Sequence, residues 1–186
     1  MLTIVRTPRI GVKLTVAPTL AWRLVVHRLS GSRPGRDTIS AVTYAADLHI
    51  HSSYAYATSP DLNLPNLARW ARTKGIDLLA TGDFTHPLWF EEIRQTLEDT
   101  GDGLFALDGV RFVLGTELSC VAPQGGRSRR VHVLVFAPSL RTVNRINRRL
   151  SAAGALLGGD GRPTLRLTPR ELVTTLLEID DGCMIV

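Results

Sequence analysis

Polar residues with metal-binding side chains follow the apolar stretch VTYAA at residues 42–46. Asp47, His49 and His51 alternate here with Leu48 and Ile50. Alternate side chains of a strand point to the same face, so an extended stretch places Asp47, His49 and His51 together. Two imidazoles beside a carboxylate can hold a divalent metal ion. Short His-x-His patterns also occur without any metal, so this pattern alone leaves the metal site open.

Similar residues recur at the ends of later apolar runs. Asp83 and His86 follow the run IDLLATG, Glu117 follows RFVLGT, and His132 lies within RRVHVLV. Taken singly, these have ordinary explanations: a turn with an Asp cap, an edge glutamate and a core histidine. Their repetition favours a metal cluster, because the carboxyl ends of parallel strands gather functional side chains at one end of a sheet or barrel.

The donor types suggest the metal and its chemistry. Nitrogen and oxygen donors without thiolates suit zinc or manganese, with magnesium as a further candidate. Such centres hydrolyse phosphate esters by lowering the pKa of water and by holding the attacking and leaving oxygens. The expected metal ligands are His49, His51, Asp83, His86, Glu117 and His132, and the expected catalytic carboxylates are Asp47, Asp83 and Glu117.

The elements that must position these residues alternate between strand and helix patterns. Strands are predicted over 42–51, 76–83, 109–121 and 129–139, and helices over 64–75, 86–99, 139–154 and 168–180. The last helix has a strong start, with Thr168 as N-cap, Pro169 at the first helical position and Glu171 three residues after the cap. This alternation predicts an α/β domain with largely parallel strands. The chain stops within an apolar run, which we interpret as truncation of a larger domain.

Arginines are concentrated on either side of His132 in the sequence. Arg127, Arg129 and Arg130 lie in one Gly-rich loop, and Arg141, Arg145 and Arg148 share a face of the following helix. Arginine suits phosphate because its planar guanidinium donates several hydrogen bonds. We expect these six residues to contact phosphate groups, which would be DNA phosphates if the chain is a nuclease, the alternative being an ordinary solvated face.

Charge and composition divide the chain. Residues 1–43 hold seven of the 22 basic residues and one of the 17 acidic residues, so the net charge of +5 belongs mainly to this stretch. We predict a basic, poorly ordered extension over 1–43, with an organelle-targeting segment as the alternative, and the catalytic domain over 44–186. Apolar runs are too short for a membrane span. The two cysteines form no disulfide framework, which favours the cytoplasm.

The motifs resemble those of the PHP (polymerase and histidinol phosphatase) superfamily. DLHIHSSYAYATS, TGDFTHP, GTELS and VHVLVFAPS are similar to its four successive motifs, within residues 44–186. The resemblance implies a distorted (β/α)7 barrel, of which this chain would be the N-terminal portion. It also implies two or three metal ions in the complete enzyme.

The amino-acid sequences of these motifs are most similar to those of the endonuclease Q family. The matching stretches are ADLHIHSSYAYATS, LARWARTKGIDLLATGDFTHPLWFEEI, VHVLVFAPSL and DGRPTL. The resemblance implies an enzyme that nicks DNA on the 5′ side of deaminated bases (uracil, hypoxanthine, xanthine) or at abasic sites. GDFTHP replaces the usual TDH motif, which leaves open whether Asp83, His86 or both bind metal.

Three functions remain as hypotheses. The leading one is a metal-dependent endonuclease for damaged DNA, in an incomplete form whose activity could be lost and whose barrel a second chain could complete. The second is a PHP phosphatase for a small phosphomonoester. The third is a non-catalytic remnant that binds nucleic acid.

Overall fold

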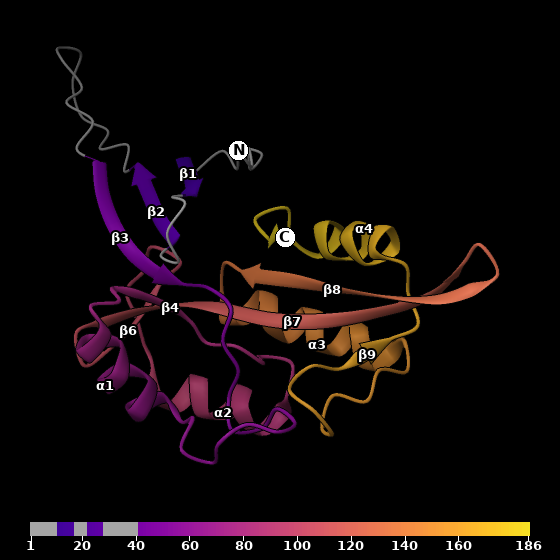
Figure 1. Ribbon diagram of the computed structural model, residues 1–186, viewed down its shortest axis with the longest axis horizontal. Coiled ribbons are helices and arrows are strands. Elements are labelled where there is room, and N and C mark those ends of the chain that lie inside the picture. Colours follow the sequence, from indigo (N-terminus) through magenta and orange to yellow (C-terminus); the bar gives the residue numbers. More distant parts are fainter. Residues whose placement is uncertain (1–10, 17–21, 28–40) are drawn as a thin grey trace, which may run out of the picture.

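The computed structural model describes the backbone of residues 11–16, 22–27 and 41–186, and the side chains from Ala45 onward. Figure 1 shows the arrangement of the elements. The strands are β1 Gly11–Val16, β2 Trp22–His27, β3 Ala41–Asp47, β4 Leu78–Ala80, β5 Glu98–Asp99, β6 Phe105–Leu107, β7 Val110–Gln124, β8 Arg127–Ala137, β9 Thr164–Leu165 and β10 Met184–Ile185. The helices are α1 Leu64–Lys74, α2 Pro87–Thr96, α3 Leu140–Ala152 and α4 Pro169–Ile179.

The strands form a mixed sheet, with the order β1-β2-β3-β4-β7-β6-β5, and β7 also pairs with β8 and β9. The pairs β3–β4, β4–β7 and β7–β9 are parallel, whereas β1–β2, β2–β3, β6–β7 and β7–β8 are antiparallel. The predicted α/β class is therefore confirmed, but the expectation of largely parallel strands is wrong. The barrel stays a prediction.

A two-residue turn explains the largest departure from a parallel sheet. Gly125 and Gly126 connect β7 directly to β8 and have positive φ angles of 60° and 74°. Tight hairpin turns of this kind need two residues that tolerate left-handed backbone, and they force the joined strands to run antiparallel. The long β7–β8 hairpin projects past the helices to a free tip (Figure 1).

Local chemistry explains the ends of α1 and α4, whereas α2 stops at Thr96, short of the predicted residue 99, and Glu98–Asp99 form β5. Asn63 caps α1 by accepting a hydrogen bond from Asn66 N, and Gly75 ends it with φ of 69°. Thr168 and Glu171 form the expected capping box at the start of α4. The buried faces of the helices pack on the sheet in one core whose largest members are Trp89, Phe84, Phe105 and Phe112.

The stretch before Tyr44 contributes strands to the sheet. β1 pairs with β2, and β2 pairs with β3, within the region for which we expected weak order. The remaining residues of that region, 1–10, 17–21 and 28–40, lie outside the described residues, so a domain boundary at residue 43 stays a prediction. No helix in the described part of the chain is long and apolar enough to cross a membrane.

Candidate metal centre

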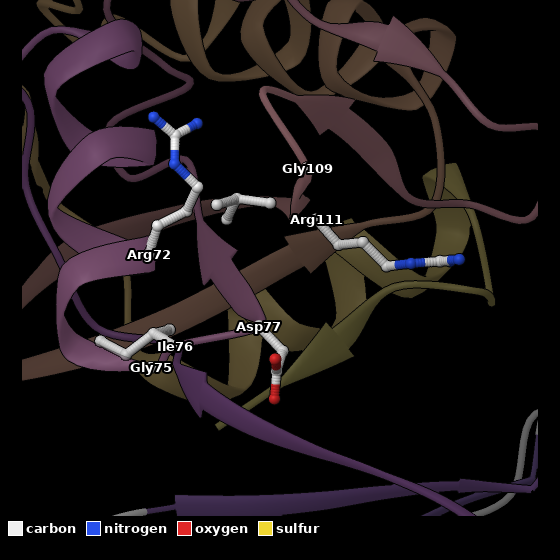
Figure 2. A pocket seen from close by; sticks show the side chains of 7 residues that line it. Arg72, Gly75, Ile76, Asp77, Gly109 and Arg111 are labelled. Atoms are coloured by element: carbon white, nitrogen blue, oxygen red, sulfur yellow. The ribbon is translucent and has the colours of Figure 1, made fainter.

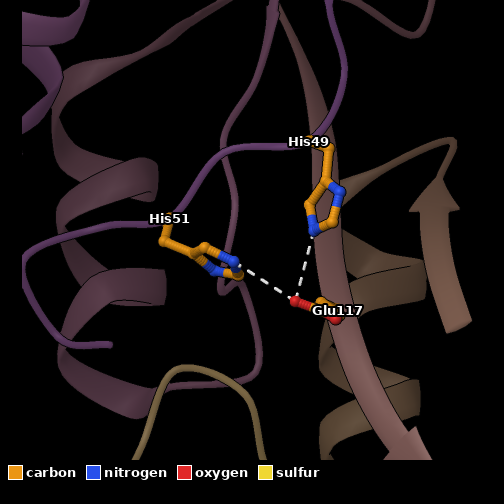
Figure 3. A group of neighbouring side chains, drawn as sticks. All are labelled: His49, His51 and Glu117. Carbon is orange, nitrogen blue, oxygen red and sulfur yellow. Dashed lines mark hydrogen bonds and ion pairs between the residues drawn. The ribbon is translucent and has the colours of Figure 1, made fainter. Parts of the chain in front are cut away.

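Three side chains from two distant segments meet beside β7. Glu117 Oε2 lies 3.2 Å from His49 Nε2 and 3.2 Å from His51 Nε2 (Figure 3). The three ligand atoms all lie within 4.8 Å of one another. His49 is half-exposed, with 53% of its side chain accessible, whereas only 7% of the Glu117 side chain is accessible. The group therefore has a buried carboxylate on one side and an open approach on the other.

The backbone that carries the two histidines is not a strand. β3 ends at Asp47, and residues 48–51 continue as an irregular segment. The expectation that alternation along a strand places Asp47, His49 and His51 on one face is therefore wrong. The Asp47 carboxylate instead accepts a hydrogen bond from the backbone N–H of His49 at 3.3 Å. This local turn leaves Asp47 outside the three-residue group.

His132 reaches the same carboxylate from the neighbouring strand. Its Nδ1 forms a short hydrogen bond with Glu117 Oε1, the oxygen that His49 and His51 do not contact. His132 lies opposite Ser119 in the β7–β8 register, and directly opposed residues of paired strands share a face. Since Ser119 and Glu117 are two residues apart, the hairpin presents Glu117 and His132 together.

Glu117 is held in its charged form by its neighbours. Burial by itself raises the pKa of a carboxyl group, but hydrogen bonds from His49 and His132 outweigh it. The pKa of Glu117 consequently lies below its usual value. A charged carboxylate among three imidazoles suits a site for a cation.

The donor set fits a divalent metal ion. Two imidazole nitrogens and one carboxylate oxygen, with no thiolate, are the ligands of many catalytic zinc sites, which keep a further position open for water or substrate. The same donors also suit manganese. His49, His51 and Glu117 would hold the ion.

Asp83 lies on the other side of the His51 ring from Glu117. Its Oδ1 is 3.0 Å from His51 Nδ1, the ring nitrogen that faces away from Glu117. Its Oδ2 accepts hydrogen bonds from the backbone N–H and the hydroxyl of Ser52, at 2.6 and 2.8 Å. Asp83 therefore touches the histidine that would bind metal and does not itself join the three ligand atoms.

His86 is set apart from the group. Its ring stacks on Tyr54, with centroids 4.5 Å apart and planes 25° from parallel. It is also the N-cap residue of α2 and makes no side-chain capping bond. Within the described part of the chain, its buried Nδ1 has no hydrogen-bonding partner. The structure thus gives His86 a packing role and does not bring it to Glu117.

Two residues that sequence reasoning missed complete the surroundings. Ser52 supplies both donors to Asp83 Oδ2. Gly161, from the loop before β9, packs so closely that a Cβ there would lie 2.5 Å from Asp83 Cγ. The serine directly follows His51 and so was accessible to sequence reasoning, whereas nothing in the sequence links Gly161 to Asp83.

The six candidate arginines are placed differently. Arg130 Nη1 donates a hydrogen bond to Ser119 Oγ at 3.2 Å, and Arg130 alternates with His132 on the site face of the hairpin. Arg127 and Arg129 alternate with Arg130 along β8, which places them on its opposite face. Arg141, Arg145 and Arg148 are exposed on α3, whose Asn147 donates to the Phe84 carbonyl at 3.0 Å. Only Arg130 is thereby tied to the face that carries Glu117.

A separate hollow of about 300 Å³ lies at the opposite ends of β4 and β7 (Figure 2). Arg72, Asp77 and Arg111 contribute its charged side chains. Arg72 donates to the Asp108 carbonyl, and Asp77 accepts from the backbone N–H of Ala45. These side chains already bind other parts of the protein, so the hollow is a weaker candidate for a functional site than the group at Glu117.

Comparison with known proteins finds relatives for most of the chain. Sequence identity is 29% over 133 residues to an uncharacterized protein of Methanocaldococcus jannaschii, covering 72% of this chain. The crystal structure of a lesion-specific endonuclease, EndoQ from Pyrococcus furiosus, matches with a TM-score of 0.65 and 33% identity over 75% of this chain. A structure of endonuclease Q with a 27-mer duplex bearing an abasic lesion matches with a TM-score of 0.66 and 33% identity. No family model matches the sequence.

These matches confirm the resemblance to endonuclease Q in both sequence and fold. The chain spans 15% of the length of the Methanocaldococcus protein and 33% of each endonuclease Q chain.

Proposed function

We propose that this chain carries metal-binding residues of a phosphodiesterase that cuts DNA at damaged sites, as a PHP-type relative of endonuclease Q. The meeting of His49, His51 and Glu117 at one point carries the proposal, because a nuclease of this kind needs a cation beside the scissile phosphate. The similarity to endonuclease Q supports DNA as the substrate.

The residues around the group have distinct tasks in this proposal. A divalent ion held there would neutralise charge on the phosphate and lower the pKa of water. His49 and His51 would bind the ion through Nε2, and Glu117 would supply the negative charge that attracts it. His132 holds the second oxygen of Glu117 and so fixes the plane of the carboxylate. Arg130 donates to a neighbouring phosphate of the same strand.

The finer parts of the proposal concern substrate and place. We propose deaminated bases, namely uracil, hypoxanthine and xanthine, and abasic sites as the lesions that direct cutting. A damaged base pairs and stacks less well, so it is the easier base to turn out of the helix. Zinc or manganese is the proposed ion, and the cytoplasm is the proposed location, since both described cysteines are free thiols.

A cleavage assay tests this function. The full chain, loaded with zinc or manganese, would be incubated with end-labelled duplexes that carry an abasic site, uracil, hypoxanthine or no lesion. We expect nicks at the lesions that Glu117→Gln abolishes and Glu91→Gln, an exposed change on α2, retains. Preference for p-nitrophenyl phosphate over DNA would favour the phosphatase. DNA binding without cutting, unchanged in the His49→Ala/His51→Ala variant, would favour the non-catalytic remnant.

A further inference from the structure

The Asp83–His51 contact assigns a proton. His51 Nδ1 faces a carboxylate oxygen of Asp83 at 3.0 Å, while His51 Nε2 faces Glu117 at 3.2 Å. A neutral imidazole carries one proton, and a carboxylate that accepts it at one nitrogen leaves the other nitrogen with a free lone pair. We propose that Asp83 is a positioning residue that keeps the His51 proton on Nδ1 and turns Nε2 towards the metal position. This inference rests on the metal centre of the proposed function.

The second oxygen of Asp83 fixes the orientation of the carboxylate. Oδ2 is occupied by two donors of Ser52, the backbone N–H and the hydroxyl. The residue is fully buried, with 0% of its surface exposed. With Oδ2 bound to both donors of Ser52, Oδ1 is the oxygen that faces His51.

The backbone is bent to make this contact. Gly82 and Asp83 both have positive φ angles, 64° and 46°. Residues other than glycine seldom adopt this region, and such outliers persist where surrounding structure determines them. A Cβ on Gly82 would lie 2.5 Å from the Ile50 carbonyl oxygen. The turn therefore brings the two segments together backbone against backbone and places Asp83 behind His51.

A third segment closes the arrangement. Gly161 N donates to the Tyr54 carbonyl at 3.1 Å, and the position of a Gly161 Cβ would be 2.5 to 2.8 Å from Asp83 side-chain atoms. Gly161 does not have a positive φ, so its backbone permits alanine, and the three atoms nearest to the added Cβ would all belong to Asp83. Gly161→Ala thus offers a way to displace the Asp83 carboxylate while every ligand and donor is kept.

An amide at position 83 gives a sharper test than truncation. Asn has one acceptor oxygen and one donor NH2. If its oxygen keeps the two Ser52 hydrogen bonds, its NH2 points at His51 Nδ1 and forces the proton onto Nε2, where it blocks metal binding. Asp83→Asn should consequently weaken metal binding by roughly 10- to 100-fold, the range for changes to groups behind a ligating histidine.

The experiment determines which ring nitrogen of His51 carries the proton. Nitrogen NMR of histidine-labelled full-length chain, with His51→Ala for assignment, gives the tautomer of His51 in the metal-free protein. Competition with a chromophoric chelator gives zinc affinity. We expect the Nδ1–H form in the unsubstituted chain, the Nε2–H form with weaker zinc binding in Asp83→Asn, and weaker zinc binding in Gly161→Ala. Asp99→Asn, an exposed control on β5, should change neither.

Three results would overturn the assignment. They are an Nε2–H tautomer in the unsubstituted chain, a zinc affinity that Asp83→Asn and Gly161→Ala both leave within about twofold, and loss of the Nδ1–H signal when zinc binds. A chain that binds no zinc but keeps the Nδ1–H form separates the two claims, because the metal centre then fails while the Asp83–His51 contact stands. If Asp83→Asn does not fold, the tautomer of the unsubstituted chain and Gly161→Ala still decide.

Discussion

His49 Nε2 and Glu117 Oε2 lie 3.2 Å apart although 68 positions separate them in the chain. β3 and β7 both pair with β4 in parallel, so the three strands run in the same direction. The segment that follows β3 therefore lies near the middle of the longer strand β7. His132 then reaches the other oxygen of Glu117 through the β7–β8 hairpin. Histidines from the segment after β3 and from β8 therefore contact the same carboxylate. This arrangement is the basis of the metal-centre proposal.

Arg130 should contribute one phosphate contact to DNA binding. Arg130→Gln removes a cation from the site face of the hairpin, so the slope of log affinity against log salt should fall by about one unit. Fluorescence anisotropy of a labelled duplex across a salt series measures this. Arg94→Gln, which removes an exposed arginine paired with Glu91, is the matched control. An unchanged slope for Arg130→Gln, or an equal fall for Arg94→Gln, would remove Arg130 from the DNA surface.

Thr168 should matter to stability out of proportion to its size. Its hydroxyl accepts from Glu171 N and its backbone N–H donates to the Glu171 carboxylate. Thr168→Ala should lower the free energy of unfolding by about 1 kcal/mol, the usual cost of losing an N-cap. Thr174→Ala, an exposed threonine of the same helix, should have a smaller effect or stabilise. Urea unfolding measures both free energies, provided that their slope against urea concentration is the same in all variants. Equal losses of unfolding free energy in both variants would contradict the capping role.

The two cysteines should resist modification in the folded chain. Burial raises the pKa of Cys120, and burial together with the Asp180 charge raises the pKa of Cys183 to about 12. Because thiolate is the reactive form, iodoacetamide at pH 8 should modify both slowly in the folded chain and rapidly in urea. Mass spectrometry over time measures this, and rapid modification of Cys183 in the folded chain would contradict the packing of β10 against β8.

The same raised pKa fixes the sign of a pH effect. A group whose folded pKa is raised stabilises fully below its unfolded pKa, which is about 8.5 for a thiol. That stabilisation is lost as pH rises towards the folded pKa of Cys183, about 12. Unfolding free energy should therefore fall with pH above 8.5, and Cys183→Ala should reduce that fall. A fall of the same size in Cys183→Ala would assign it to other groups.

Two helix ends were predictable because they depend on neighbours in the chain. Gly75 and Thr168 each act on backbone groups within a few residues, and their residue types suit that task. The end of α2 was predicted at residue 99 but lies at Thr96. The same locality made the stretch around Gly125 and Gly126 visible as a Gly-rich connection. The antiparallel hairpin that they require was nevertheless missed, since strand–helix alternation elsewhere favoured parallel pairing.

The site was predictable in part, for a similar reason. His49, His51, Glu117 and His132 could be found because each is a ligand-type residue in or next to an apolar strand pattern. Asp83 and His86 have the same residue types but different surroundings, because left-handed backbone at Gly82 and Asp83 turns one side chain towards Ser52 and the other towards Tyr54. The closeness of Gly161 to Asp83 depends on tertiary packing alone.

Metal content tests the central claim most directly. The full chain, Glu117→Gln, His49→Ala/His51→Ala and Glu91→Gln would be exposed to zinc and manganese, freed of excess ion and analysed for metal per folded chain. The account predicts about one ion or more per chain in the unsubstituted protein and in Glu91→Gln, and loss of it in the other two. A folded chain that holds no ion, or that holds as much after Glu117→Gln and His49→Ala/His51→Ala, would contradict the metal centre.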